Sequence, residues 1–262
     1  MELEHILRTG MAAAHKGGEI LQNYFGKTFE VSKKGAIDLV TQADIGSEKI
    51  IIETIRSKFP DHSVLAEESG LNQGSADFQW IIDPLDGTTN FAHRIGLFSV
   101  SIAFAVNGNM AAGIVLNPIS GELFTAIAEK GSELNGRQIK VSNTSTVSES
   151  LLVTGFPYHF NKNFDNLLRR FSNCLKASQG VRRLGSAALD LCFVACGRFD
   201  GFWEQNLNPW DTAAGMLIAG EAGAAVTDFS NIPFTVDMKE LLATNGKIHK
   251  EMISLLETED TE

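Results

Sequence analysis

The stretch Trp80–Phe91 reads WIIDPLDGTTNF and places two carboxylates at the end of an apolar segment, directly before Gly-Thr-Thr. Proline has no N–H to donate to a sheet and biases the residue before it toward extended backbone, so we expect the strand to end at Asp83 and turn sharply. Asp83 and Asp86 would then share one bend, with the carbonyl of Leu85 facing the same point. Such a bend is suited to hold a hard cation beside a phosphate.

The residues after this bend favour an anion site. Gly87 permits a close backbone approach, and if Thr88 opens a helical turn, its free N–H groups can bind a phosphate oxygen. Asp-Pro and Asp-Gly are also ordinary turn dipeptides, so the stretch taken alone is also compatible with a plain surface turn.

Composition sets the frame for this motif. The chain has 262 residues, 44% of them hydrophobic, which is enough for a large core in one domain or in two closely packed lobes. Its formal net charge of -10 argues against broad binding to nucleic acid or to an anionic membrane. An acidic protein also repels phosphate unless a bound cation reverses the local field.

Features of the termini and the cysteines indicate a cytoplasmic protein. The start Met1–Glu4 lacks the basic and then apolar pattern of a secretory signal, and no apolar run approaches the roughly 20 residues that span a bilayer. Three cysteines fit a reducing compartment, and Cys192 and Cys196 lie in an apolar helical pattern typical of core residues. The six histidines are scattered, which gives little support to a zinc site.

The pattern of helix and strand signals changes along the chain. The pattern of residues 1–145 predicts long amphipathic helices and an antiparallel sheet, with a hairpin around Asn107–Asn109. Residues 146–262 predict alternating strands and helices, and the polar stretch Ser142–Thr146 is the expected boundary. We therefore expect an α+β N-terminal lobe and an α/β C-terminal lobe that together form one catalytic unit.

Two further acidic motifs share the design of the first. Leu65–Gly70 places Glu67 at a strand end, and Asn208–Gly215 places Asp211 at a helix start. Each has a structural alternative, since Glu67 could be a solvated turn residue and Asp211 could serve only the first turn of its helix.

Taken together, these motifs resemble those of the inositol monophosphatases, within the group of lithium-sensitive, magnesium-dependent sugar and polyol phosphatases. The resemblance runs from about Asp38 to Gly223. The matching pieces, in family order and spacing, are Asp38–Thr41 with Asp44, Glu67–Ser69, Asp83–Thr88, Gly185–Ala188, Asp200–Glu204 and Pro209–Asp211. The resemblance implies an α/β fold, a layered αβαβα sandwich, assembled as a homodimer.

The family pattern also implies a set of metal ligands. Glu67, Asp83 and the Leu85 carbonyl would bind one Mg²⁺ ion, Asp83, Asp86 and Asp211 would bind another, and a third, weaker ion would use Glu67 and water. Elementary chemistry agrees, because carboxylates that converge without a cation raise one another's pKa. An all-oxygen ligand set favours Mg²⁺, with Mn²⁺ as a possible substitute, over zinc.

The resemblance implies that Thr88 and Asp44 orient the attacking water. It also implies that the backbone amides of Gly87 and Thr88 bind the phosphate. Lys33 would add positive charge near a loop that covers such sites. Two of these residues have ordinary alternatives: Asp44 could form a helix capping pair with Thr41, and Lys33 could be a solvated surface lysine.

Substrate choice is more open than the chemistry. Glu204 and the Ala187 backbone match positions that contact the ring hydroxyls of inositol phosphate, and Asp86 can face the same side. Arg182 and Arg183 could bind a second phosphate, as in relatives that act on fructose 1,6-bisphosphate, or could be ion-paired at a lobe or dimer contact. Histidinol phosphate and NADP are further alternatives within the family.

Two rival functions belong to other classes. A phosphatase with an aspartyl-phosphate intermediate would use Asp-x-Asp, whereas Asp83 and Asp86 are three residues apart and lie in the middle of the chain. A regulatory protein that binds another macromolecule, with catalysis secondary, is also compatible with the sequence.

Overall fold

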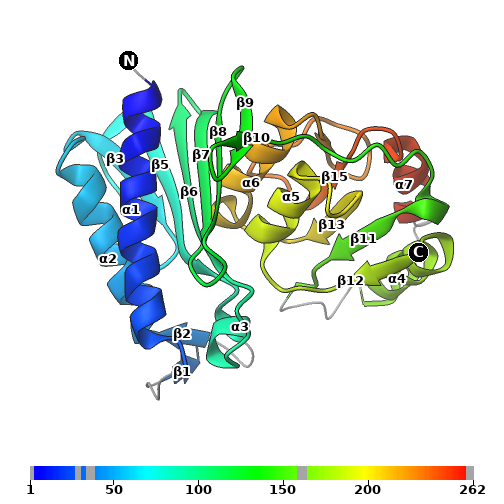
Figure 1. Ribbon diagram of the computed structural model, residues 1–262, viewed down its shortest axis with the longest axis horizontal. Coiled ribbons are helices and arrows are strands. Elements are labelled where there is room, and N and C mark those ends of the chain that lie inside the picture. The colour runs from blue at the N-terminus through cyan, green and yellow to red at the C-terminus, as the bar shows by residue number, and fades with distance from the viewer. Residues whose placement is uncertain (1–2, 27–30, 34–38, 158–163, 258–262) are drawn as a thin grey trace.

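Alternating layers of helix and sheet build the protein, as Figure 1 shows for the computed structural model, which describes residues 3–26, 31–33, 39–157 and 164–257. The helices are α1 (Leu3–Tyr24), α2 (Gln42–Arg56), α3 (Thr88–Ala92), α4 (Phe164–Ala177), α5 (Ala187–Ala195), α6 (Pro209–Glu221) and α7 (His249–Leu256), with a short 3₁₀ turn at Val147–Glu149. The layers run from α1 and α2 through a first sheet, α5 and α6, and a second sheet to α4 and α7. The predicted αβαβα sandwich is confirmed.

The first sheet has eight strands in the order β10-β9-β8-β7-β6-β5-β3-β4. These strands are β3 (His62–Ala66), β4 (Gly70–Asn72), β5 (Ser75–Asp86), β6 (Ser99–Val106), β7 (Asn109–Asn117), β8 (Glu122–Ile127), β9 (Gly131–Leu134) and β10 (Arg137–Gln138). All neighbours are antiparallel except β3 and β5, which run parallel. The predicted hairpin is present, since β6 and β7 pair up to Val106 and Asn109 around the turn Asn107–Gly108.

Strand β5 differs from the prediction because it does not end at Asp83. Its pairing with β6 continues to Asp86, which lies opposite Ser99, after an irregularity between Asp83 and Asp86. Proline is tolerated within sheets at such bulges, where its missing N–H breaks no ladder bond. The bulge therefore lets one strand carry both aspartates while Pro84 lies between them.

The second sheet has five strands in the order β12-β11-β13-β15-β14. They are β11 (Leu151–Thr154), β12 (Gly180–Arg182), β13 (Gly201–Gln205), β14 (Ala225–Thr227) and β15 (Glu240–Thr244). Between the two sheets lies α5, in which every residue is buried, as an all-round apolar helix requires. Cys192 is one of its buried residues and is not part of a disulfide.

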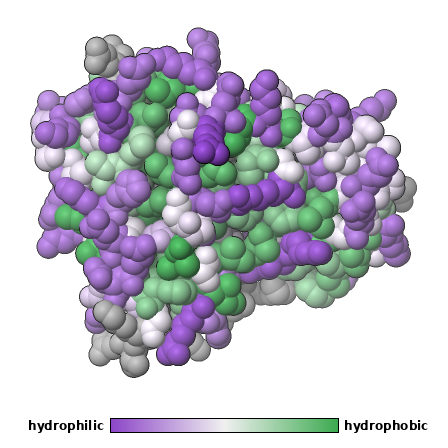
Figure 2. All heavy atoms as spheres, viewed as in Figure 1, coloured by the Kyte–Doolittle hydropathy of each residue, from purple (hydrophilic) through white to green (hydrophobic). Residues whose placement is uncertain are grey.

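The central core joins the two halves of the chain. Ile81 and Phe124 of the first sheet belong to the same apolar cluster as Leu191, Phe202 and Leu241. On the face drawn in Figure 2, hydrophilic residues predominate around the edge of the molecule and apolar residues gather toward its centre. The division at residues 145 and 146 stays an interpretation, and the packing makes the two parts one structural unit.

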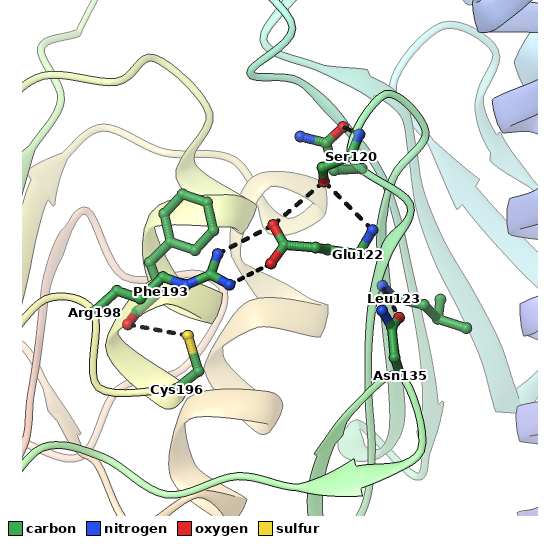
Figure 3. A network of polar contacts seen from close by, with 8 residues as sticks. Ser120, Glu122, Leu123, Asn135, Phe193, Cys196 and Arg198 are labelled. Carbon is green, nitrogen blue, oxygen red and sulfur yellow. Dashed lines mark hydrogen bonds and ion pairs between the residues drawn. The ribbon is translucent and has the colours of Figure 1, made fainter.

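An ion pair also connects the two halves of the chain. Arg198, which follows α5, donates hydrogen bonds to both carboxylate oxygens of Glu122 on β8 and lies over the ring of Phe193 (Figure 3). The guanidinium lowers the pKa of Glu122 below its usual value.

Among the described residues, no helix is both long and apolar enough to cross a bilayer.

Candidate active site

A pocket opens where β5 ends, between the two sheets. Its described lining comes from both halves of the chain: Glu67, Asp83, Leu85, Asp86, Gly87, Thr88, Gly155, Phe156, Pro157, Arg183, Gly185, Ser186, Ala187, Glu204, Gln205, Asn206, Leu207, Asn208 and Asp211. The three acidic motifs of the sequence thus meet at one place, although more than a hundred residues separate Asp83 from Asp211.

Asp86 is the most heavily bonded of these carboxylates. It lies beside the first turn of α5 and accepts hydrogen bonds from the backbone N–H of Ala188 at 2.9 Å and of Ala187 at 3.3 Å. The hydroxyl of Ser186 also donates to it, and Ser99 donates from 3.4 Å. Ser186 additionally caps α5 by accepting from the Leu189 amide, so one serine fixes both the helix start and the carboxylate.

Asp83 and Asp211 are held by backbone amides. Asp83 is 2% exposed, and its Oδ1 accepts from the Leu85 N–H at 2.9 Å. Asp211 Oδ2 accepts from the Asn208 N–H at 2.7 Å, which forms a capping box at the start of α6. Asp211 therefore has the capping role considered from the sequence and also lines the pocket.

The electrostatics of these acids favour a bound cation. Burial, followed by the charges of Glu67, Asp86 and Asp211, raises the pKa of Asp83 well above its usual value. Burial raises the pKa of Asp86 to about 6 in spite of its hydrogen bonds from Ser186 and the α5 amides. Burial also raises the pKa of Asp211. A cation in the pocket would favour the ionised form of all three.

The acids share the pocket without forming a coordination shell. Within residues 3–26, 31–33, 39–157 and 164–257, no three Asp, Glu, His or Cys side chains are arranged so that they could hold a metal ion. One carboxylate oxygen each of Asp83 and Asp211 accepts a hydrogen bond from a backbone amide. The donor set itself, carboxylates with a nearby backbone carbonyl, is the kind that Mg²⁺ prefers.

The bend after β5 has a well-defined backbone. Gly87 adopts the left-handed conformation with φ 97°, and α3 begins at Thr88, so the helical turn on which the anion-site interpretation depended is present. The hydroxyl of Thr88 donates to the Leu85 carbonyl at 3.1 Å. A Cβ atom on Gly87 would lie 3.1 Å from the carbonyl oxygen of Leu97, so both conformation and space favour glycine.

The first turns of α2 support two of the acidic segments. Ser47 Oγ donates to the Pro84 carbonyl at 3.0 Å, and the Glu68 N–H donates to Glu48 Oε2 at 2.9 Å. Asp44 is buried in the first turn of α2 and is not among the described residues that line the pocket, so its role with water stays a prediction. The sequence analysis did not single out Ser47 or Glu48.

Two other predicted positions belong to poorly described parts of the chain. Lys33 lies in β1 (Val31–Lys33), which pairs with β2 (Leu39–Thr41), and its side chain is not described. Asp38 lies outside the described residues. The predicted role of Lys33 near the phosphate stays a prediction.

The side of the pocket assigned to the substrate's alcohol contains Ala187 and Glu204. Burial, with a further contribution from Asp211, raises the pKa of Glu204 to about 8. Arg183 is exposed and lines the pocket, whereas Arg182 does not belong to its described lining. Behind the pocket, Asp190 is 1% exposed, and its Oδ1 has no hydrogen-bond partner among the described residues.

Comparison with known proteins gives one consistent result. The model of the inositol monophosphatase family matches residues 2–261. An inositol-1-monophosphatase of Synechocystis sp. is 46% identical over 257 residues, covering 97% of this chain and 90% of the relative. The Nus factor SuhB of Pseudomonas aeruginosa is 38% identical over 262 residues, covering 97% of this chain and 97% of the relative. The crystal structure of the extragenic suppressor protein suhB from Bartonella henselae superposes with a TM-score of 0.94 at 39% identity, covering 97% of this chain and 99% of that one.

Proposed function

The chain belongs to the inositol monophosphatase family and is a phosphoric monoester hydrolase, and from this premise we propose that it hydrolyses inositol monophosphate to inositol and phosphate with Mg²⁺. The observation that carries the proposal is the meeting of Glu67, Asp83, Asp86 and Asp211 in one pocket with Glu204. Carboxylates that repel one another in a pocket favour the binding of a cation, and the bound cation in turn attracts a phosphate.

The proposed ligands are those of the family pattern. Glu67, Asp83 and the Leu85 carbonyl would hold one ion, Asp83, Asp86 and Asp211 would hold another, and Glu67 would contribute to a third, weaker site. Mn²⁺ is a possible substitute, because it also prefers oxygen ligands. When bound, such ions lower the pKa of water and stabilise negative charge on the phosphoryl group and the leaving oxygen.

The protein's own groups place the reactants. Thr88 and Asp44 orient the water that attacks phosphorus in line with the ester oxygen, and the amides of Gly87 and Thr88 hold the phosphate. The water oxygen bonds to phosphorus as the P–O bond to the alcohol breaks, and a proton from the water ends on the leaving alcohol oxygen. Lys33 adds positive charge from the β1 side.

The alcohol side of the pocket supports a polyol substrate. Glu204 and Asp86 can accept hydrogen bonds from hydroxyl groups, and the Ala187 backbone lies beside them. Arg183 in the pocket lining favours a second candidate within the family, a substrate with another phosphate such as fructose 1,6-bisphosphate.

A hydrolysis panel tests the proposal. Inositol 1-phosphate, fructose 1,6-bisphosphate, histidinol phosphate and NADP are compared with and without Mg²⁺. We expect Mg²⁺-dependent release of phosphate, fastest from inositol 1-phosphate. The proposal fails if the magnesium-loaded protein hydrolyses none of them, or if Asp83→Asn leaves turnover unchanged.

A regulatory role is the second candidate, favoured by the relative that is named a Nus factor. In that case the protein binds another macromolecule through its surface and catalysis is secondary. An Asp83→Asn variant that restores wild-type behaviour to a deletion strain would support this role.

We also propose that the protein is a homodimer, which light scattering of the purified protein would test.

A further inference from the structure

The end of β11 runs directly beside the strand that carries Glu204. Strands β11 and β13 are parallel, with Thr154 opposite Trp203. The Thr154 hydroxyl is buried and donates to the Trp203 carbonyl at 2.7 Å, which fixes the two strand ends together. The next residues along each strand are Gly155 and Glu204, and both line the pocket.

A side chain at Gly155 would displace the Glu204 carboxyl group. A Cβ atom on it would lie 2.0 Å from Oε2, 2.2 Å from the carboxyl carbon and 2.3 Å from Oε1 of Glu204. The φ of Gly155 is not in the left-handed range that favours glycine, so the effect of a substitution here is on the flexible end of Glu204 and not on the backbone. The carboxyl group of Glu204 therefore occupies the place that a side chain at Gly155 would take.

The Glu204 carboxyl group lies in the pocket lining and is largely buried, with 9% of the residue exposed. A largely buried carboxyl group gains stability from hydrogen bonds that a ligand in the pocket supplies. Its place in the pocket lining makes a substrate hydroxyl the natural partner.

We propose that Gly155 is a specificity-determining residue, which by lacking a side chain seats the Glu204 carboxyl group where it binds substrate hydroxyls. The inference rests on the proposed function, because it assigns Glu204 to the alcohol part of the substrate. Gly155 then sets the preference for polyol phosphates over phosphate esters whose alcohol part has no hydroxyl groups.

The experiment compares inositol 1-phosphate with p-nitrophenyl phosphate, which lacks such hydroxyls. In Gly155→Ala we expect KM for inositol 1-phosphate to rise about tenfold, the size of one hydrogen bond, with kcat/KM for p-nitrophenyl phosphate within about twofold of wild type. Gly180→Ala is the matched control, because Gly180 lies at the neighbouring strand β12 and its nearest contact is the flexible end of Arg182 at 3.3 Å.

A double variant isolates the contact. In a Glu204→Ala background the carboxyl group is gone, so we expect Gly155→Ala to have no further effect on either substrate. If Gly155→Ala alone folds poorly, the double variant should recover the unfolding midpoint of the Glu204→Ala single variant and its hydrolysis of p-nitrophenyl phosphate.

Several outcomes would overturn the inference. Equal losses on both substrates, an effect of Gly155→Ala that persists without Glu204, or a double variant that stays unstable would each contradict it while the proposed function stands. Wild-type protein that hydrolyses p-nitrophenyl phosphate but not inositol 1-phosphate would overturn the proposed substrate and this inference together.

Discussion

Glu48 accepts a 2.9 Å hydrogen bond from the backbone amide of Glu68, and its neighbour Ser47 donates to the carbonyl of Pro84. One turn of α2 thus contacts the turn that carries Glu67 and the bend that carries Asp83. Both side chains are buried, with Ser47 fully enclosed. Partners that orient metal-ligating residues commonly matter nearly as much as the ligands themselves.

Removing the Glu48 acceptor should weaken metal binding. We expect Glu48→Ala to reduce Mg²⁺ affinity by about 10–100-fold, because the Glu67 segment loses its anchor. Glu48→Gln retains an acceptor oxygen and should stay close to wild type. Titration calorimetry and the Mg²⁺-induced shift in unfolding midpoint measure the effect without relying on activity. Equal behaviour of the Ala and Gln variants would show that Glu48 does not position the ligands.

Ser186→Ala should affect both stability and metal binding. The variant loses the cap of α5, which costs about 1 kcal/mol in the free energy of unfolding. It also removes the hydrogen bond that Ser186 donates to Asp86, so the pKa of Asp86 should rise and Mg²⁺ binding should require a higher pH.

Ser99→Ala is the matched control for Ser186, because Ser99 donates to the same oxygen of Asp86 from 3.4 Å and caps no helix. Its effect on unfolding and on the pH dependence of Mg²⁺ affinity should be smaller. The interpretation is contradicted if the two variants shift the pH dependence by the same amount.

Asp83→Asn should change stability in opposite directions with and without metal. In the metal-free protein the variant should be more stable than wild type, because it removes a carboxyl group whose ionisation is disfavoured by burial and then by the charges of Glu67, Asp86 and Asp211. With Mg²⁺ it should lose at least three orders of magnitude in kcat/KM, in line with the loss of a central ligand, together with most of the Mg²⁺-induced stabilisation. Urea unfolding in EDTA and in Mg²⁺ measures both effects, and a variant less stable in EDTA would refute the repulsion.

Local chemistry explains which features of the site were predictable. The Asn107–Gly108 hairpin depends on short-range turn rules and is confirmed, and the helical turn considered at Thr88 is present. The end of β5 was placed too early, because Pro84 alone predicts a break and the bulge that accommodates it depends on pairing with β6. The resemblance to the family predicted that Glu67, Asp83 and Asp211 lie close together, and the structure places all three in one pocket.

The supporting contacts could not be predicted from the sequence because they join distant segments. Ser47 meets the bend at Pro84, Ser186 meets Asp86, and Gly155 meets Glu204 only once the layers are stacked. Each of these residues has an ordinary local interpretation in the sequence, such as a helix surface, a helix cap or a strand end. Long-range packing converts them into the frame of the site.

The stabilisation by Mg²⁺ should grow as the pH rises from about 5 to about 8. Without metal, the pKa values of Asp86, about 6, and Glu204, about 8, lie above those of the unfolded chain, so the folded state binds more protons than the unfolded state. The free energy of unfolding contributed by these groups is therefore present at low pH and is lost as pH rises through their folded pKa values.

Bound Mg²⁺ favours the ionised carboxylates and removes this loss, so the gap between unfolding in Mg²⁺ and in EDTA should widen with pH. The difference also cancels the opposite contributions of His62 and His249, whose pKa values are lowered by burial in both conditions. Glu204→Gln should reduce the slope of metal-free stability mainly between pH 6 and 8. A gap between Mg²⁺ and EDTA that stays constant from pH 5 to pH 8 would show that the raised pKa values are not linked to metal binding.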